Sequence, residues 1–136
     1  MVRGGGNDTL LGGTSRDLLL GGAGADQIVA NGGDDLMIGN ATAFDGDDAA
    51  LKAIYAEWTS AHSFASRIAN LSGDSSSPGF ADRLNGEYYL IPFTSVYVDG
   101  AVDTLTGSSG SDWYFADWLD QVNGASNGDR VARFGP

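Results

Sequence analysis

Aspartate recurs every nine residues near the start of the chain, at Asp8, Asp17, Asp26 and Asp35. Aspartates make up 16 of the 18 acidic residues of the whole chain, and only two are Glu. A surface that needed only to be soluble would use Glu as freely, whereas the short Asp carboxylate suits tight loops and the binding of hard cations through oxygen. The spacing therefore predicts a column of carboxylates able to hold such a cation.

The residues around each Asp repeat as well, and they indicate the elements that position it. In register, the units are RGGGNDTLL from Arg3, GGTSRDLLL from Gly12, GGAGADQIV from Gly21 and ANGGDDLMI from Ala30. Because glycine permits positive φ, the first six residues of a unit predict a tight turn with inward carbonyls, and the last three predict a short strand. One such strand cannot bury its apolar side chain alone, so neighbouring units must stack to form a core.

These units resemble the RTX calcium-binding repeats, whose consensus is GGxGxDxUx. The resemblance implies a mainly β fold, a parallel β-roll (β-solenoid) in which successive strands alternate between two sheets. It also implies that the turns of units i and i+2 hold Ca²⁺ between them, with several ions in the chain. Arg3, Ser15, Ala30 and Asn31 depart from the consensus, but no unit lacks its carboxylate.

Matched residue by residue, the resemblance implies backbone carbonyls and Asp carboxylates as calcium ligands. The first site would comprise Gly4, Gly6 and Asp8 with Gly21, Ala23 and Asp26. The second would comprise Gly13, Ser15 and Asp17 with Ala30, Gly32 and Asp35. The third would comprise Gly22, Gly24 and Asp26 with Gly39, Ala41 and Asp45, the last because Phe44 stands where the next Asp would fall.

Residues 47–72 change from the nine-residue rhythm to helical spacing. Asp47 or Asp48 can cap a first helix, whose apolar residues are Leu51, Ile54, Tyr55 and Trp58. A second short helix is expected to start at Ser63 and to present Phe64, Ile68 and Leu71 on one face. We expect this helical insertion to be a hairpin that packs as an apolar plug against the roll. A ligand groove is the alternative.

Residues 80–134 are expected to form a second, degenerate repeat block and a C-terminal cap. The roll is predicted to resume at residues 82–86, which repeat the Asp-x-apolar signature, and residues 86–100 predict two strands divided by Pro92. Aromatic residues at 113–118 indicate a cap, with a partner-binding patch as the alternative. The candidate ligands of this block are Asp82, Asp103, Asp112, Asp120 and Asp129, with Gly107 and Ser109 near Asp112 and Gly124 and Ser126 near Asp129.

The order of these parts gives a broader resemblance, to C-terminal modules of large bacterial RTX-type surface and secreted proteins. It is carried by residues 49–60 and 103–115, and it covers nearly the whole chain. It implies a secreted or cell-surface location.

Composition narrows the class of protein further. The 136 residues are expected to form one domain, with a formal net charge of −11 and only 7 basic residues, which argues against nucleic acid as a partner. The absence of Cys excludes disulfides and thiolate metal sites, and no apolar run is long enough to span a membrane. Residues 1–3 lead directly into glycines with no secretion-signal core, so we expect either a fragment or a type I-like export route.

Calcium is expected to control folding. Two stacked carboxylates about 5 Å apart repel by about 3 kcal/mol at an effective dielectric near 20, so the metal-free roll should be unstable. The chain is thus expected to be a structural module that folds on binding Ca²⁺ outside the cell and supports secretion and surface assembly. The alternative is a subunit that associates head to tail through open strand edges into a calcium-dependent filament or matrix.

An enzyme is not expected. His62 is the single histidine and falls in the linker between the predicted helices, and no nucleophile turn is recognisable. Paired carboxylates are abundant, but their nine-residue spacing is explained by a cation and not by a cleft.

Overall fold

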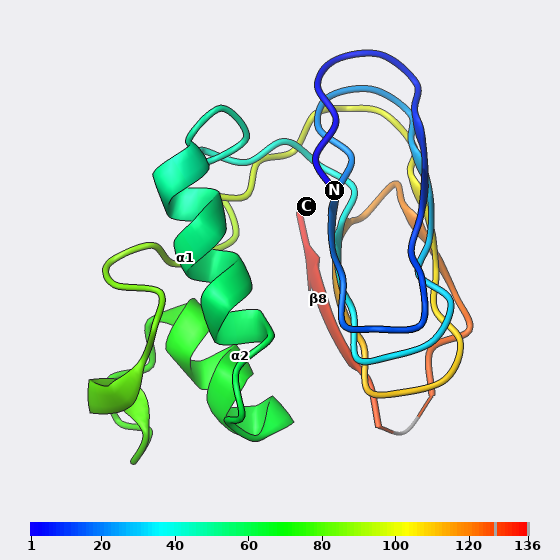
Figure 1. The fold of residues 1–136 in the computed structure, drawn as a ribbon. Coiled ribbons are helices and arrows are strands. Elements are labelled where there is room, and N and C mark those ends of the chain that lie inside the picture. The colour runs from blue at the N-terminus through cyan, green and yellow to red at the C-terminus, as the bar shows by residue number, and fades with distance from the viewer. Residues whose placement is uncertain (127, 136) are drawn as a thin grey trace.

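The computed structural model of the chain describes residues 1–126 and 128–135. Its strands form two parallel four-stranded sheets, with the orders β1-β3-β5-β7 and β2-β4-β6-β8. Successive strands alternate between the two sheets, so the chain winds through them in a β-roll-like arrangement (Figure 1). The strands are β1 (Thr9–Leu11), β2 (Leu18–Leu20), β3 (Gln27–Val29), β4 (Leu36–Ile38), β5 (Thr104–Thr106), β6 (Trp113–Asp117), β7 (Gln121–Asn123) and β8 (Arg130–Phe134).

Two helices interrupt the series of strands between β4 and β5. Helix α1 (Asp48–Trp58) is capped by Asp47, whose side chain accepts a hydrogen bond from the Ala50 N–H. Helix α2 (Phe64–Ser72) is capped by Ser63 and ends at Gly73, which has a left-handed φ of 75°. The prediction of a mainly β chain with an inserted pair of helices is therefore confirmed.

The apolar residues form two clusters that explain the burial pattern of the strands. The central residues of strands from both sheets pack together in the inner cluster, which comprises Leu10, Leu19, Ile28, Ala30, Met37, Leu105 and Tyr114. The flanking residues of β2, β4 and β6 pack against Ile54, Trp58, Ile68 and Leu71 of the helices. All residues of these three strands are thus buried, whereas β1, β3 and β5 bury only their central residue. The helices act as the predicted apolar plug, on the outer face of the β2-β4-β6-β8 sheet.

The register of the sheets passes through the insertion unchanged. Leu10 pairs with Ile28, and Ile28 pairs with Leu105, although 18 residues separate the first pair and 77 the second. The insertion therefore adds 59 residues to one coil without displacing the next strand.

Residues 80–102 differ from the sequence-based expectation. Residues 80–82 form a short 3-10 helix (Phe80–Asp82), and Leu84 is 52% exposed, so the predicted resumption of the roll at residue 82 is wrong. The two strands predicted in residues 86–100 are reduced to isolated bridges, in which Val96 pairs with Thr42 and Pro92. The Asp-x-apolar signature misleads here because three residues do not specify whether the apolar one is buried.

No helix in the described part of the chain has the length and apolar character needed to cross a membrane.

Candidate metal centre

The structure arranges eight aspartates into two columns, one along each line of stacked turns. The first column comprises Asp8, Asp26, Asp103 and Asp120, and the second comprises Asp17, Asp35, Asp112 and Asp129. Within each column, the backbone N–H of one Asp donates to Oδ1 of the next Asp at 2.8–2.9 Å. We call each pair of consecutive aspartates a rung. The sequence prediction that units i and i+2 meet is matched by the rungs between Asp8 and Asp26 and between Asp17 and Asp35.

The second carboxylate oxygen of each central aspartate is buried and has no hydrogen-bond partner among the described residues. These oxygens are Oδ2 of Asp26, Asp35, Asp103 and Asp112, whose residues are 0–3% exposed. At two of the column ends the corresponding oxygen is satisfied within its own turn: Oδ2 of Asp17 accepts from the Gly13 N–H at 2.8 Å, and Oδ2 of Asp129 accepts from the Ser126 N–H at 2.8 Å. An unpaired buried carboxylate oxygen is costly unless a cation neutralises it. The centre of each column therefore provides buried carboxylate oxygens that a bound cation would stabilise.

Burial is the main cause of the raised pKa values of the column aspartates. It raises the pKa of Asp35 and of Asp103 to about 7, and it raises the pKa of Asp112 and of Asp120 to about 6. The pKa of Asp26 is raised for the same reason. Neighbouring carboxylates add to each rise, because every aspartate in a column is flanked by others.

Backbone carbonyls of one turn face the glycines of the turn stacked on it. A Cβ added to Gly22 would clash with the Gly4 carbonyl oxygen, and one added to Gly24 would clash with that of Gly6. Both glycines have positive φ, 97° and 119°, so the turn geometry and the close approach each require glycine. In the second column, Gly33 faces the Ser15 carbonyl in the same way. The stacked turns therefore place carbonyl oxygens of one turn against glycines of the next, and the role of these carbonyls as calcium ligands stays a prediction.

The first position of a unit lies against the carboxylate that closes the same turn. A Cβ at Gly21 would clash with Oδ2 of Asp26, and one at Gly107 would lie 2.6 Å from Oδ2 of Asp112. The space beside these oxygens is open only because glycine lacks a side chain. Other residues predicted to supply carbonyl ligands lie in the same turns. The Gly13 oxygen accepts from the Gly32 N–H, and the Ala23 oxygen accepts from the Gly6 N–H. The Ala30 oxygen faces Gly12, Ser109 lies beside Gly32, and Gly124 faces the Gly107 oxygen.

Three predicted ligands lie away from the columns. Asp45 accepts hydrogen bonds from the N–H and Oγ1 of Thr42, in a local turn at the start of the insertion. The Ala41 carbonyl accepts from the Tyr97 N–H, and Asp82 is exposed in the 3-10 helix. The aspartate that follows Asp26 in the first column is Asp103, so the structure corrects the expected third site, which used Ala41 and Asp45.

Sequence reasoning missed two aspartates that connect the turns to their surroundings. Asp34 precedes Asp35, and its Oδ1 accepts from the Ser111 N–H at 2.9 Å while its Oδ2 pairs with Arg67 at 2.9 Å. Asp99 accepts through Oδ2 from the Gly24 N–H at 3.0 Å. The sequence signal for Asp34 was its place as the fifth residue of its unit, which Asn7 occupies in the first unit. Asn7 accepts from the N–H of Ala25 in the stacked turn, as Asp34 accepts from that of Ser111.

The donor set fits a hard cation and no other kind of metal. It consists of carboxylate and backbone carbonyl oxygens, which Ca²⁺ prefers. Among residues 1–126 and 128–135, no three His, Cys, Asp or Glu side chains lie close enough to hold a metal by themselves. An ion in the columns would therefore depend on the carbonyls of the turns as well as on the aspartates.

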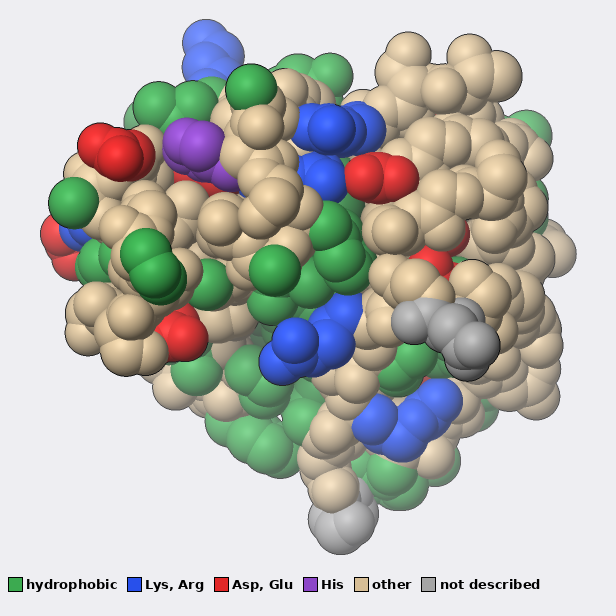
Figure 2. Space-filling view, turned by 90° about the horizontal axis from the view of Figure 1, so that it is seen from below, with side chains coloured by type: hydrophobic (Ala, Val, Ile, Leu, Met, Phe, Trp, Pro, Cys, Tyr) green, Lys and Arg blue, Asp and Glu red, His purple; other side chains and the backbone are tan. Residues whose placement is uncertain are grey.

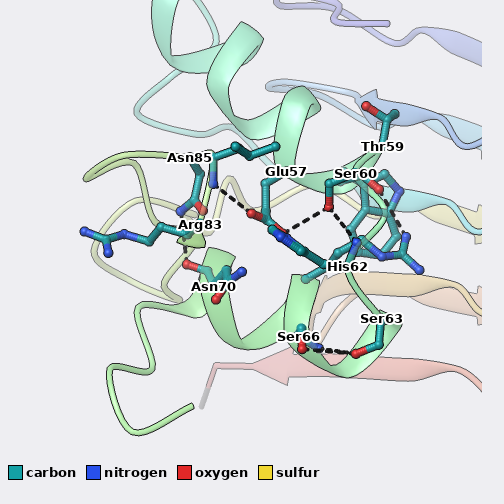
Figure 3. A network of polar contacts seen from close by, with 12 residues as sticks. Glu57, Thr59, Ser60, His62, Ser63, Ser66, Asn70, Arg83 and Asn85 are labelled. Atoms are coloured by element: carbon teal, nitrogen blue, oxygen red, sulfur yellow. Dashed lines mark hydrogen bonds and ion pairs between the residues drawn. The ribbon is translucent and has the colours of Figure 1, made fainter. Parts of the chain in front are cut away.

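A separate polar network lies in the helical insertion, as Figure 3 shows. The fully buried Glu57 accepts from the Leu84 N–H at 2.9 Å and lies 2.8 Å from Nδ1 of His62. These bonds fasten the α1–α2 linker and the loop after the 3-10 helix to the end of α1. The network satisfies a buried carboxylate and lies on the insertion, not in the columns.

Comparison with known proteins agrees with this geometry. The sequence model of the RTX calcium-binding nonapeptide repeat matches residues 3–41 and 97–118, in four copies. No match was found among curated proteins or among solved structures. The matched segments contain six of the eight column aspartates, and the gap between them coincides with the helical insertion.

Proposed function

Because this chain carries RTX calcium-binding nonapeptide repeats, which bind Ca²⁺, we propose that it is a structural module whose aspartate columns fold around calcium outside the cell. The observation that carries the proposal is the set of four buried carboxylate oxygens without a partner at the centres of the columns. Calcium supplies positive charge and accepts six to eight oxygen ligands, so it can neutralise two aspartates and bind carbonyls of both turns.

The proposed ligands are the column aspartates together with carbonyls of the stacked turns. In the first rung we propose the carbonyls of Gly4 and Gly6, which lie against Gly22 and Gly24 of the turn stacked on theirs. In the described residues of the second block, Gly107 lies beside Asp112 and Ser126 beside Asp129. On this proposal the stacked coils form a β-roll that holds one calcium ion in each filled rung.

The charge balance supports calcium as a folding switch. Without metal, the columns contain adjacent carboxylates in a chain whose net charge is already −11. If each site has a dissociation constant near 10⁻⁴ M, millimolar calcium contributes about 1.4 kcal/mol per site, or about 6 kcal/mol for four sites. That is comparable with the whole stability of a small domain, so calcium decides whether this module is folded.

The proposed location follows from the calcium requirement. RTX repeat proteins are typically secreted or surface-associated, and extracellular calcium is in the millimolar range in which such sites fill. An unfolded chain inside the calcium-poor cell would pass through a secretion channel and fold after export.

Calcium titration after removal of metal with EGTA tests the proposal. We expect circular dichroism to show a disordered chain in EGTA and a β spectrum in millimolar calcium, and calorimetry to show several bound ions per chain. Magnesium at the same concentration serves as the control, because it demands smaller octahedral sites with retained waters. A β spectrum that is identical with and without calcium would contradict the proposal.

Head-to-tail self-assembly has weaker support. Strand β8 is at the edge of its sheet and carries Arg130 and Arg133, and charged side chains on an edge strand oppose pairing with another strand. We also infer a structural role and not a catalytic one, because the sequence model that matches is that of a calcium-binding repeat. Light scattering at increasing calcium should therefore show a monomer.

A further inference from the structure

The helical insertion is spliced into a single turn of the repeat. A Cβ at Gly39 would clash with Oδ2 of Asp103, the same relation that joins Gly21 to Asp26. Gly39 and Asp103 therefore occupy the first and sixth positions of one turn, although they are 64 residues apart in the chain. We call this the split turn. Its two halves coincide with the two segments that match the repeat family, which end at residue 41 and resume at residue 97.

A short antiparallel pairing closes the split turn. Thr42 pairs with Val96, the Ala43 N–H donates to the Ser95 carbonyl at 2.8 Å, and the Tyr97 N–H donates to the Ala41 carbonyl at 2.9 Å. We call residues 41–43 and 95–97 the neck. Thr42 is 7% exposed and Val96 is fully buried, so the neck is part of the packed structure and not a loose loop.

The split turn contributes Asp103 to the one rung of the first column in which both Oδ2 atoms are buried and, among the described residues, unpaired. Oδ1 of Asp103 accepts from the Asp26 N–H at 2.8 Å, while Oδ2 of both residues is buried and unpartnered. The Gly39 carbonyl also lies next to Gly21 in the neighbouring turn. The oxygens around this rung thus come from before and after the insertion, and they meet only when the neck is closed.

We propose that closing the neck assembles this composite calcium site, so that folding of the helical insertion and calcium binding at the Asp26–Asp103 rung are coupled. The proposal rests on the proposed calcium-dependent function and adds a control element to it. In an ordinary turn the first and sixth positions are 5 residues apart, whereas here they are 64 apart. The free-energy cost of closing a loop grows as (3/2)RT times the logarithm of its length, so the probability of closure falls with the three-halves power of length, and the split turn is roughly 50-fold less likely to close unless the insertion is folded.

The packing of the insertion provides the means of coupling. Trp58 of α1 donates from Nε1 to the Asp34 carbonyl at 2.9 Å, and Arg67 of α2 pairs with the Asp34 carboxylate at 2.9 Å. Asp34 adjoins Asp35 of the second column. Figure 2 shows this side of the molecule from below, with hydrophobic side chains gathered along the middle of the face, between the helical part and the repeats. The helices also share an apolar cluster with Leu36, which precedes the split turn, and with Phe115, which follows it, so they hold the repeats on both sides of that turn.

A reversible cross-link at the neck tests the coupling. The chain has no Cys, and paired residues on antiparallel strands have Cα atoms about 4.5–5.5 Å apart, a separation that suits a disulfide. In the double variant Thr42→Cys, Val96→Cys, we expect oxidation to lower the calcium midpoint several-fold relative to the reduced form of the same protein. Loop closure sets an upper limit of roughly 50-fold. The unmodified chain with and without reductant is the control.

The readouts are calorimetry and the indole N–H NMR signal of Trp58, which reports docking of α1. A second variant, Ala43→Pro, removes the N–H that donates to the Ser95 carbonyl in the neck, at a residue whose side chain is exposed. It should raise the calcium midpoint and shift the appearance of the docked Trp58 signal to higher calcium concentration. Its matched control is Asp48→Pro, at the first position of α1, where proline is tolerated.

The outcomes separate the coupling from the proposed function. Equal calcium midpoints for the oxidised and reduced forms, with calcium still bound, would overturn the coupling alone. The same holds if Ala43→Pro and Asp48→Pro bind alike. If the unmodified chain binds no calcium, the proposed function itself fails.

Discussion

At the scale of single residues, each central aspartate serves two neighbouring turns at once. Asp35 fixes its Oδ1 by accepting from the Asp17 N–H at 2.8 Å, and its own N–H donates to Oδ1 of Asp112 at 2.9 Å. Its Oδ2 is left buried and without a partner. The hydrogen bonds therefore set the direction of the carboxylate, while the free oxygen is available for an ion.

Replacing Asp35 by Asn should affect two rungs. In Asp35→Asn we expect a loss of about 3 kcal/mol in the free energy of unfolding in millimolar calcium, because two sites of about 1.4 kcal/mol each lose a carboxylate. In EGTA the variant should show no less β structure than the unmodified chain, since a buried charge has been removed. Urea unfolding in calcium measures the loss, and circular dichroism in EGTA compares the two metal-free chains.

The exposed Asp82 provides the control for that experiment. Asp82→Asn removes the same charge from a residue outside the columns, so calcium binding should not change. If Asp82→Asn weakens calcium binding as much as Asp35→Asn does, the assignment of the columns as the binding site is wrong.

The turn glycines set a second requirement at this scale. Gly33 has a φ of 108°, and a Cβ there would clash with the Ser15 carbonyl. Gly33→Ala should lower the free energy of unfolding in calcium by roughly 1–3 kcal/mol, because both the backbone conformation and the close approach are strained. Gly13→Ala is a matched control, since an added Cβ meets no atom within 4 Å. Equal stabilities of the two variants in thermal unfolding would show that the turns do not need the close approach.

At the scale of elements, the helices are held to the repeats by an ion pair between the buried Arg67 and the half-buried Asp34. The Arg67 side chain is 2% exposed and pairs with Asp34 at 2.9 Å, and its guanidinium carbon lies 4.6 Å from the ring centroid of Trp58. Asp34 also accepts from the Ser111 N–H, so it links α2 to two stacked turns. This residue joins the insertion to the second column.

Removing this arginine should loosen the insertion. Arg67→Met leaves the Asp34 carboxylate without its cation and is expected to cost roughly 1–3 kcal/mol in chemical unfolding. Arg83→Met is the control, because Arg83 pairs with Glu87, which is 84% exposed, and such a surface pair contributes about 1 kcal/mol or less. A double-mutant cycle with Asp34→Asn should give a coupling energy clearly above zero. Additive effects of the two substitutions would show that this ion pair does not hold the helices to the repeats.

The elements differ in how well they could be predicted from the sequence. The four contiguous units were predictable because each combines a turn, an Asp and a buried apolar residue within nine positions. The caps Asp47 and Ser63 likewise indicated where the helices begin. The continuation of the first column at Asp103 was not predictable, because it depends on a 77-residue offset that only the packing of the insertion fixes. Residues 82–84 and 103–105 both carry the Asp-x-apolar signature, but Leu84 is 52% exposed while Leu105 is fully buried.

At the scale of the whole molecule, the columns make folding respond to both calcium and protons. Burial raises the pKa of Asp35 and Asp103 to about 7, above the ordinary value of 3.8 for an unfolded chain. The folded, metal-free chain therefore binds more protons than the unfolded chain over this range. The stability contributed by these groups is present below about pH 4 and is lost as the pH rises through about 7.

Calcium should reverse the direction of this pH dependence. Ca²⁺ binds the ionised carboxylates and competes with their protons, so in millimolar calcium the free energy of unfolding should rise between about pH 5 and 7. In EGTA the chain is expected to be disordered near pH 7 and to gain β structure as the pH falls toward 5, because raised carboxyl pKa values favour the protonated folded state. Urea unfolding in calcium and circular dichroism in EGTA, each at several pH values, should therefore show the folded state favoured in opposite pH directions. The same pH trend in both buffers would mean that calcium does not bind at the groups that take up these protons, and the aspartate columns could then not be the calcium sites.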